Sequence, residues 1–111
     1  MDCNSYSYAP HMLDGKENYI ESYEHGDMSS TIEESARGNI GHWERGYTVW
    51  AGSYDGSLDV CEFYRTIKAA RFLHSAIVDN FSDSAPTKKE IRALINQAKR
   101  IDKKGAKNNA A

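Results

Sequence analysis

The side chains best suited to chemistry in this sequence are four histidines and two cysteines, and they are widely scattered. The histidines are His11, His25, His42 and His74, and the cysteines stand at positions 3 and 61. No two of these residues have the short helical or hairpin spacing of a local zinc-binding pair. His74 falls on an apolar helical stripe, where we expect a hydrogen-bonded core histidine. The sequence therefore predicts no metal site and no cofactor.

Nucleophiles, paired carboxylates and phosphate-binding loops are also poorly supported. Cys61 could act as a nucleophile beside a histidine, but no surrounding motif supports this, and a buried structural cysteine is the simpler interpretation. Glu33 and Glu34 are adjacent, so their side chains would diverge by about 100° on a helix instead of forming an acid–base pair. The glycines of RGNIGHWERG and AGSYDGS do not follow the strand–loop–helix pattern of a nucleotide-binding loop. We therefore expect a protein that is not an enzyme.

Aromatic residues concentrate in the middle of the chain and provide a lead to a binding surface. Trp43, Tyr47, Trp50 and Tyr54 fall within twelve residues, with glycines and Arg45 between them. Trp, Tyr and Arg are the residue types that most often dominate the energetics of protein interfaces. The alternative is that these rings form the core of a domain that has few aliphatic residues. We expect at least one of them to be exposed and to contact a partner.

A second lead is the basic segment TKKEIRALINQAKRIDKK, residues 87–104. On a helical wheel its apolar residues form a stripe about 120° wide, as expected for a helix that packs on a core. Arg92, Lys99 and Lys103 form a basic ridge beside this stripe, and Arg100 lies farther round.

Three interpretations of the basic ridge remain open. It can be a solvated flank that partly neutralises the acidic half of the chain, a docking surface for an acidic protein, or a nucleic-acid contact through Arg92, Lys99, Arg100 and Lys103. Phosphates would meet such a ridge well. However, the helix has no aromatic residue to stack on bases, and the chain as a whole is acidic, with a pI of 6.1.

Charge and apolar content divide the 111-residue chain unevenly. Residues 1–60 contain eleven acidic and three basic residues, a net charge of −8, whereas residues 61–111 contain five acidic and eleven basic residues, a net charge of +6. Ile, Leu, Val and Phe together number only 18, which makes the expected core small. A small core and an uneven charge distribution favour a protein that binds a partner. That partner can be a second copy of the same chain, so a homo-oligomer is one of the alternatives.

The first part of the chain, residues 1–45, is acidic and rich in Tyr and Ser. Turn signals around the run 19–23 predict an edge strand there. The segment SSTIEESARGN predicts a short helix, capped by Ser30 or Thr31 and ended by Gly38. The alternative is that residues 1–45 form loops and short strands, or stay loosely ordered until a partner binds.

The rest of the chain has clearer signals. Residues 46–65 predict a β-hairpin, in which runs 47–51 and 58–64 flank the turn pair Asp55-Gly56, although a helix from Ser57 onward competes. Residues 66–80 predict a helix capped by Thr66. Residues 87–104 predict a second helix, which a T-K-K-E capping box begins and Gly105 ends, followed by a frayed tail at 105–111. A short loop should pack the two helices antiparallel or on one face of the sheet.

These elements predict a single small α+β domain: an antiparallel sheet built around the central hairpin and packed against two C-terminal helices. No leader and no run of apolar residues long enough for a membrane span is evident, so we expect a cytoplasmic protein.

The function expected is that of a non-enzymatic interaction protein, an inhibitor or adaptor that occludes a surface on a larger protein. Small phage-encoded inhibitors of host defence are comparable in size and charge. The alternatives are a nucleic-acid-binding accessory protein that uses the basic helix, and a protein that sequesters a small molecule or nucleotide in a pocket around Trp43 and Trp50.

Overall fold

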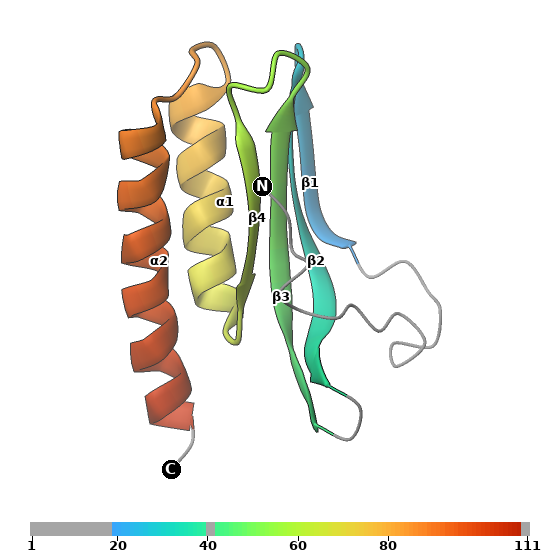
Figure 1. Cartoon of the computed structure of the whole chain (residues 1–111), viewed down its shortest axis with the longest axis vertical. Helices are drawn as coiled ribbons and strands as arrows, with labels where there is room; N and C mark the ends of the chain where they lie inside the picture. Colours follow the sequence, from blue (N-terminus) through green and yellow to red (C-terminus); the bar gives the residue numbers. More distant parts are fainter. Residues whose placement is uncertain (1–18, 40–41, 110–111) are drawn as a thin grey trace.

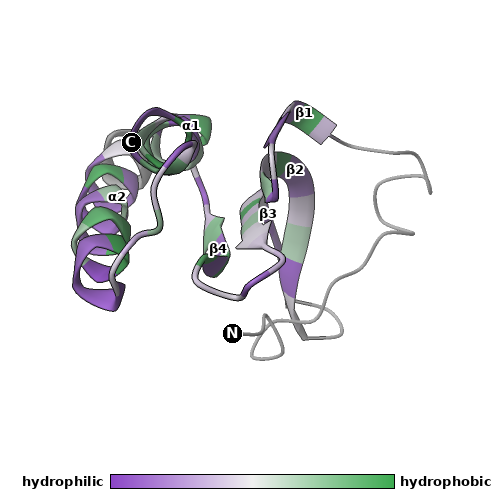
Figure 2. Ribbon diagram, turned by 90° about the horizontal axis from the view of Figure 1, so that it is seen from above, coloured by the Kyte–Doolittle hydropathy of each residue, from purple (hydrophilic) through white to green (hydrophobic). Residues whose placement is uncertain are grey.

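The computed structural model describes residues 19–39 and 42–109, which form a four-stranded antiparallel sheet and two helices (Figure 1). The strands follow one another across the sheet in chain order: β1 (Tyr19–His25), β2 (Met28–Asn39), β3 (His42–Ser53) and β4 (Asp59–Tyr64). The helices α1 (Ile67–Phe81) and α2 (Lys88–Asn109) run antiparallel to each other and lie on the same side of the sheet (Figure 2). The predicted α+β class and the helix arrangement are confirmed.

The central hairpin is confirmed, and the competing helix from Ser57 onward is wrong. Within it, β3 and β4 pair from Tyr47 opposite Tyr64 to Gly52 opposite Asp59. The turn between them uses Gly56 with φ 78°, and the Asp55 carboxylate accepts hydrogen bonds from the Ser57 amide (2.9 Å) and the Ser53 hydroxyl (2.7 Å). These hydrogen bonds, that of the Ser57 amide first, lower the pKa of Asp55 to about 2.

The predicted helix in SSTIEESARGN is wrong, because this segment lies inside the long strand β2. Met28, Ser30 and Ile32 alternate as buried residues on the face that meets the helices. This alternation is difficult to recognise in the sequence because Ser30 is polar. Its hydroxyl oxygen lies 2.7 Å from Nδ1 of His74, 44 positions away, and this hydrogen bond lets the serine be buried. Thr31, the other predicted cap, instead lies 3.2 Å from the Ser22 hydroxyl on β1.

Strand β1 confirms the predicted edge strand at 19–23, and Gly26 with φ 60° turns the chain into β2. Residues 19–25, 28–39 and 42–45 therefore lie in strands, and residues 26–27 form the turn between the first two. This arrangement agrees with the alternative of strands and loops; the alternative of an order that depends on a partner stays a prediction. The predictions for residues 1–18 lie outside the described residues. Gly38, expected to end a helix, sits in β2 opposite Trp43 with φ 131°.

One core lies between the sheet and the helices. It combines Ile32 of β2, Val49 of β3 and Val60 of β4 with residues of α1 such as Leu73 and of α2 such as Ile95. Tyr64, only 1% exposed, is the largest of the fully buried side chains and helps to replace the missing aliphatic volume.

The helix starts are as predicted, but the predicted end of the second helix is wrong. Thr66 caps α1 by accepting a hydrogen bond from the Ala69 amide, and Thr87 and Glu90 exchange the two hydrogen bonds of a capping box at α2. Gly105 does not stop α2, which continues to Asn109, so the expected frayed tail is helical over 105–109. A Cβ at Gly105 would lie 3.1 Å from the Thr66 methyl group, so this glycine serves the close approach of α2 to the start of α1.

Candidate functional site

The aromatic residues predicted to bind a partner do not form one surface. Trp50, 42% exposed, lies on the sheet face away from the helices, and Tyr54, 93% exposed, lies in the β3–β4 turn. Tyr47 is partly buried against the core on the opposite face, and Arg45 is exposed further along β3. The side chain of Trp43 lies outside the described residues. The expectation that at least one aromatic is exposed is confirmed, while its contact with a partner stays a prediction.

A shallow hollow beside Trp50 bears on the small-molecule hypothesis. Its volume is about 250 Å³, and Thr31, Trp50 and Cys61 are among the residues that line it. Typical ligand pockets have about 300–1,000 Å³. The hollow is therefore small for a nucleotide-sized molecule.

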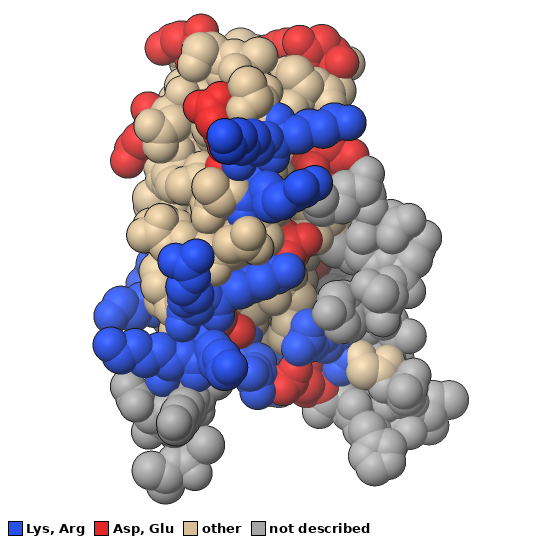
Figure 3. All heavy atoms as spheres, turned by 60° about the vertical axis from the view of Figure 1, so that its left-hand side comes forward, with Lys and Arg blue, Asp and Glu red and all other residues tan. Residues whose placement is uncertain are grey.

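The predicted basic ridge is fully on the surface and is larger than the sequence suggested. Seven basic residues are exposed among those α2 residues whose side chains the structure describes, and we call them together the basic face of α2: Lys88, Lys89, Arg92, Lys99, Arg100, Lys103 and Lys104. Figure 3 shows Lys and Arg side chains gathered along this side of the molecule, most densely toward its lower end. The four residues predicted for nucleic-acid contact all belong to this face.

No residue of the basic face has an ion pair with an acidic side chain in the part of the chain that the structure describes. Two acidic residues of the first half pair with other bases: Glu21 with Arg71 of α1 at 2.9 Å, and Glu44 with Arg37 of β2 at 3.0 Å. The expected partial neutralisation of the basic helix by the acidic half does not occur by direct contact among the described residues.

The opposite end of the molecule is acidic. The β1–β2 turn, the β3–β4 turn and the α1–α2 loop meet there, as the hydrogen bond from the Tyr54 amide to the Asp27 carbonyl (3.3 Å) illustrates. Asp27, Asp55 and Asp83 line one hollow at this end. Among the described residues, however, no group of His, Cys, Asp and Glu side chains has the arrangement of a metal site.

A groove separates α2 from the last strand of the sheet, and we call it the α2–β4 groove. Its volume is about 600 Å³, within the usual range of about 300–1,000 Å³ for ligand pockets. Its lining comprises Gly56, Ser57, Asp59, Glu62, Lys88, Ile91, Arg92, Ile95, Asn96 and Lys99. One wall is therefore the flank of α2 that carries Lys88, Arg92 and Lys99, and the other includes Asp59 and Glu62 of β4.

Glu62 is the carboxylate of β4 that points toward α2, because it shares the sheet face of Val60 and Tyr64. Burial raises the pKa of this carboxyl group, and the positive charge of Lys99 only partly opposes that effect. The groove thus holds a partly desolvated carboxylate beside a row of cations. Sequence reasoning missed Glu62; its polar side chain at a core-facing position of the hairpin was the available signal.

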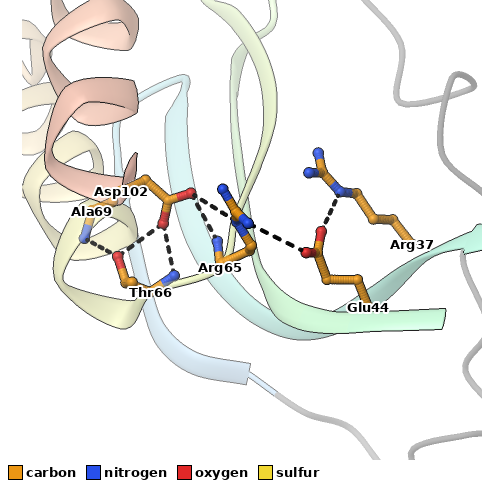
Figure 4. A network of polar contacts seen from close by, with 6 residues as sticks. All are labelled: Arg37, Glu44, Arg65, Thr66, Ala69 and Asp102. Atoms are coloured by element: carbon orange, nitrogen blue, oxygen red, sulfur yellow. Dashed lines mark hydrogen bonds and ion pairs between the residues drawn. The ribbon is translucent and has the colours of Figure 1, made fainter. Parts of the chain in front are cut away.

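A polar network fastens the lower end of α2 to the sheet and to α1 (Figure 4). Asp102, only 9% exposed, accepts hydrogen bonds from the Thr66 amide (2.8 Å), the Thr66 hydroxyl (2.9 Å) and the Arg65 amide (3.1 Å). Arg65 also lies 3.8 Å from Glu44, which Arg37 binds at 3.0 Å. Sequence reasoning missed Asp102, although a carboxylate inside the apolar stripe of α2 was a visible signal.

His74 is the buried core histidine that the sequence predicts. Its Nδ1 lies 2.7 Å from the Ser30 hydroxyl, and its Nε2 lies 3.6 Å from the Glu21 carboxylate. Burial lowers the pKa of His74, and Glu21 opposes this only partly, since Arg71 already binds that carboxylate at 2.9 Å. With the proton on Nε2 facing Glu21, the Ser30 hydroxyl donates to Nδ1.

The His74 environment predicts a stability that falls in mild acid. Because the folded-state pKa lies below the unfolded value of 6.5, the unfolded chain takes up the proton first as the pH falls. The free energy of unfolding should therefore drop as the pH is lowered through 6.5, and His74→Gln should drop less steeply. Urea unfolding of both proteins between pH 7.5 and 5, on the order of one pH unit either side of that value, measures this. Equal slopes in the two proteins would contradict it.

Comparison with protein-family models, with curated proteins and with solved structures gave no significant match to this chain. Neither helix in the described part of the chain has the length and apolar content needed to cross a membrane.

Proposed function

We propose that this protein is a non-enzymatic interaction protein, which binds an acidic surface on a larger protein and acts there as an inhibitor or adaptor. The observation that carries the proposal is the basic face of α2, whose seven exposed cations form no ion pair with an acidic side chain among the described residues. Complementary charge on a partner would speed association and orient docking. We include a cytoplasmic location in this proposal, as expected from the sequence.

The α+β fold supports this proposal because it leaves α2 accessible. Only the stripe around Ile91, Ile95 and Ala98 is needed for packing on the core, so the remaining circumference of the helix can serve another purpose. The capping box at Thr87 and the hydrogen bonds to Asp102 hold both ends of this helix in place. A helix fixed in this way loses little backbone conformational freedom when its cations bind a partner.

Nucleic acid is the second candidate partner, because the same side of the molecule gathers Lys and Arg side chains (Figure 3). A phosphate backbone would meet several of these cations at once, and its affinity would fall steeply with salt. The net charge of −2 for the whole chain favours the protein partner over this alternative. Electrophoretic mobility shifts with single- and double-stranded DNA and RNA at two salt concentrations test the candidate. No shift at the lower salt concentration would exclude it.

The protein partner is tested by capture from nuclease-treated native cell extract. The tagged wild-type chain should retain a stoichiometric partner that elutes as salt is raised. The triple variant Lys99→Glu, Arg100→Glu, Lys103→Glu should lose at least about ten-fold of it, because these changes reverse the charge that attracts the partner.

A charge-preserving variant, Lys99→Arg, Arg100→Lys, Lys103→Arg, is the matched control and should retain the partner. No stoichiometric partner, or equal recovery with the charge-reversed variant, would contradict the proposed function. Circular dichroism of the three proteins checks that each one is folded.

A further inference from the structure

We infer that the α2–β4 groove binds a short extended acidic peptide segment, and that this segment is how the larger partner engages the basic face of α2. This inference rests on the proposed function and specifies the part of α2 that makes the contact. Only the flank of α2 that carries Lys88, Arg92 and Lys99 lines the groove.

The dimensions of the groove fit an extended chain. Lys88 and Lys99 are eleven residues apart on α2, which is about 16 Å along the helix axis. An extended peptide advances about 3.3 Å per residue, so about five residues span that length. Side chains on one side of the peptide recur about every 6.6 Å, close to the helical rise of about 6 Å between Lys88 and Arg92.

The chemistry of the groove fits a peptide with carboxylates and an apolar side chain. Ile91 and Ile95 of α2 provide apolar surface in the groove. The exposed side chains of Lys88, Arg92 and Lys99 provide the positive charges along the same wall. Asn96, exposed between these cations, has both a donor and acceptor and can bond to a peptide group. A peptide in which an apolar residue stands between two acidic residues would place its carboxylates near the cations and its apolar side chain near Ile91 and Ile95.

The opposite wall favours a peptide over nucleic acid. Asp59 and Glu62 of β4 line that wall, so a phosphate chain in the groove would lie opposite two carboxylates. A peptide, unlike a phosphate chain, need not carry a charge at every residue, so it can place uncharged amide groups next to Glu62. In addition, none of the described residues that line the groove has an aromatic ring to stack on a base.

The test uses the purified full chain and three fluorescent probes: the peptide Glu-Leu-Glu-Leu-Glu, the peptide Lys-Leu-Lys-Leu-Lys and a single-stranded oligothymidylate. Fluorescence anisotropy should show saturable binding of the acidic peptide and none of the basic one. Arg92→Glu should weaken that binding at least about ten-fold, whereas Arg100→Glu, with the same change in net charge but outside the groove, should weaken it less than about three-fold.

A second matched pair changes shape without changing charge. Asn96→Trp fills the groove and should abolish binding of the acidic peptide, whereas Gln97→Trp on the other flank of α2 should leave it intact. Amide chemical shifts of Gly56, Ser57 and Glu62 should move on titration of the wild-type chain.

The outcomes separate the two proposals. Equal losses with Arg92→Glu and Arg100→Glu would overturn the groove as the binding site but support the basic face of α2 as a whole. No peptide binding by the wild-type chain would overturn the groove inference and leave the proposed function to the capture experiment. Displacement of the acidic peptide by the oligothymidylate, with the same sensitivity to Asn96→Trp, would assign the groove to nucleic acid instead.

Discussion

Replacing Gly46 by alanine is expected to lower the free energy of unfolding by about 3 kcal/mol, because the site has no room for a methyl group. A Cβ there would lie 2.3 Å from the Tyr64 carbonyl oxygen and 2.4 Å from the Phe63 ring. The carbonyl belongs to the neighbouring strand β4 and cannot rotate away. The Phe63 ring is itself held under the Arg37 guanidinium, whose central carbon lies 4.4 Å from the ring centre. Separation of β3 from β4 is the main way to relieve the contact.

Gly52 provides the matched control because it occupies the same strand, β3, with open space at its Cβ position. The nearest atom there would be the Leu58 carbonyl oxygen at 3.8 Å, an ordinary contact distance. Gly52→Ala should be neutral or stabilise by about 0.5–1 kcal/mol, since alanine has less backbone freedom to lose on folding. Urea unfolding monitored by Trp fluorescence compares the two variants. Equal stabilities would show that β3 and β4 adjust more easily than this packing implies.

Replacing Asp102 by alanine is expected to lower the free energy of unfolding by about 3 kcal/mol through the loss of buried hydrogen bonds. Two backbone amides, of Arg65 and Thr66, and the Thr66 hydroxyl would lose their acceptor at a site where water has little access. Asp102→Asn should also be destabilising, because the amide nitrogen would face donors. The loss should be greatest at the start of α1, since Thr66 is both a partner of Asp102 and the cap of that helix.

The matched control for Asp102 is Asn96→Ala, an exposed position on the same helix without a role in packing. Its stability should stay within about 0.5 kcal/mol of the wild-type value. Hydrogen exchange of the Ala69 and Ala70 amides adds a local measurement, and both should exchange faster in Asp102→Ala. A stability loss below about 1 kcal/mol, with unchanged exchange at Ala69, would mean that Asp102 does not fasten the two helices.

Local signals predicted most of the elements correctly. The capping box at Thr87, the cap at Thr66 and the Asp55-Gly56 turn depend on residues only a few positions apart, so their geometry follows from the chain itself. In β3, strand alternation alone places Val49 on the buried core face and Trp50 on the opposite, exposed face. The basic face of α2 was visible for the same reason, because helical periodicity alone places its cations on one side.

The incorrect predictions share one physical cause, which is burial of polar or small residues by contacts that are distant in the sequence. Ser30 can be buried in a strand because its hydroxyl hydrogen-bonds to His74. Gly105 lies inside a helix at the point where Thr66 approaches that helix closely. In the local sequence, a serine that has a distant buried partner resembles a helix N-cap. A glycine that packs against a neighbouring helix resembles a helix end.

By itself, the sequence determined the α+β class, the two helix starts, the central hairpin and the cationic side of α2, since each follows from short-range backbone preferences and side-chain periodicity. Only the tertiary structure decided that those cations form no ion pair with the described acidic side chains and that one flank of them borders the α2–β4 groove. The physical reason is that the angle and separation between a helix and a sheet depend on the whole core, including contacts such as that of Asp102 with Thr66 across 36 positions.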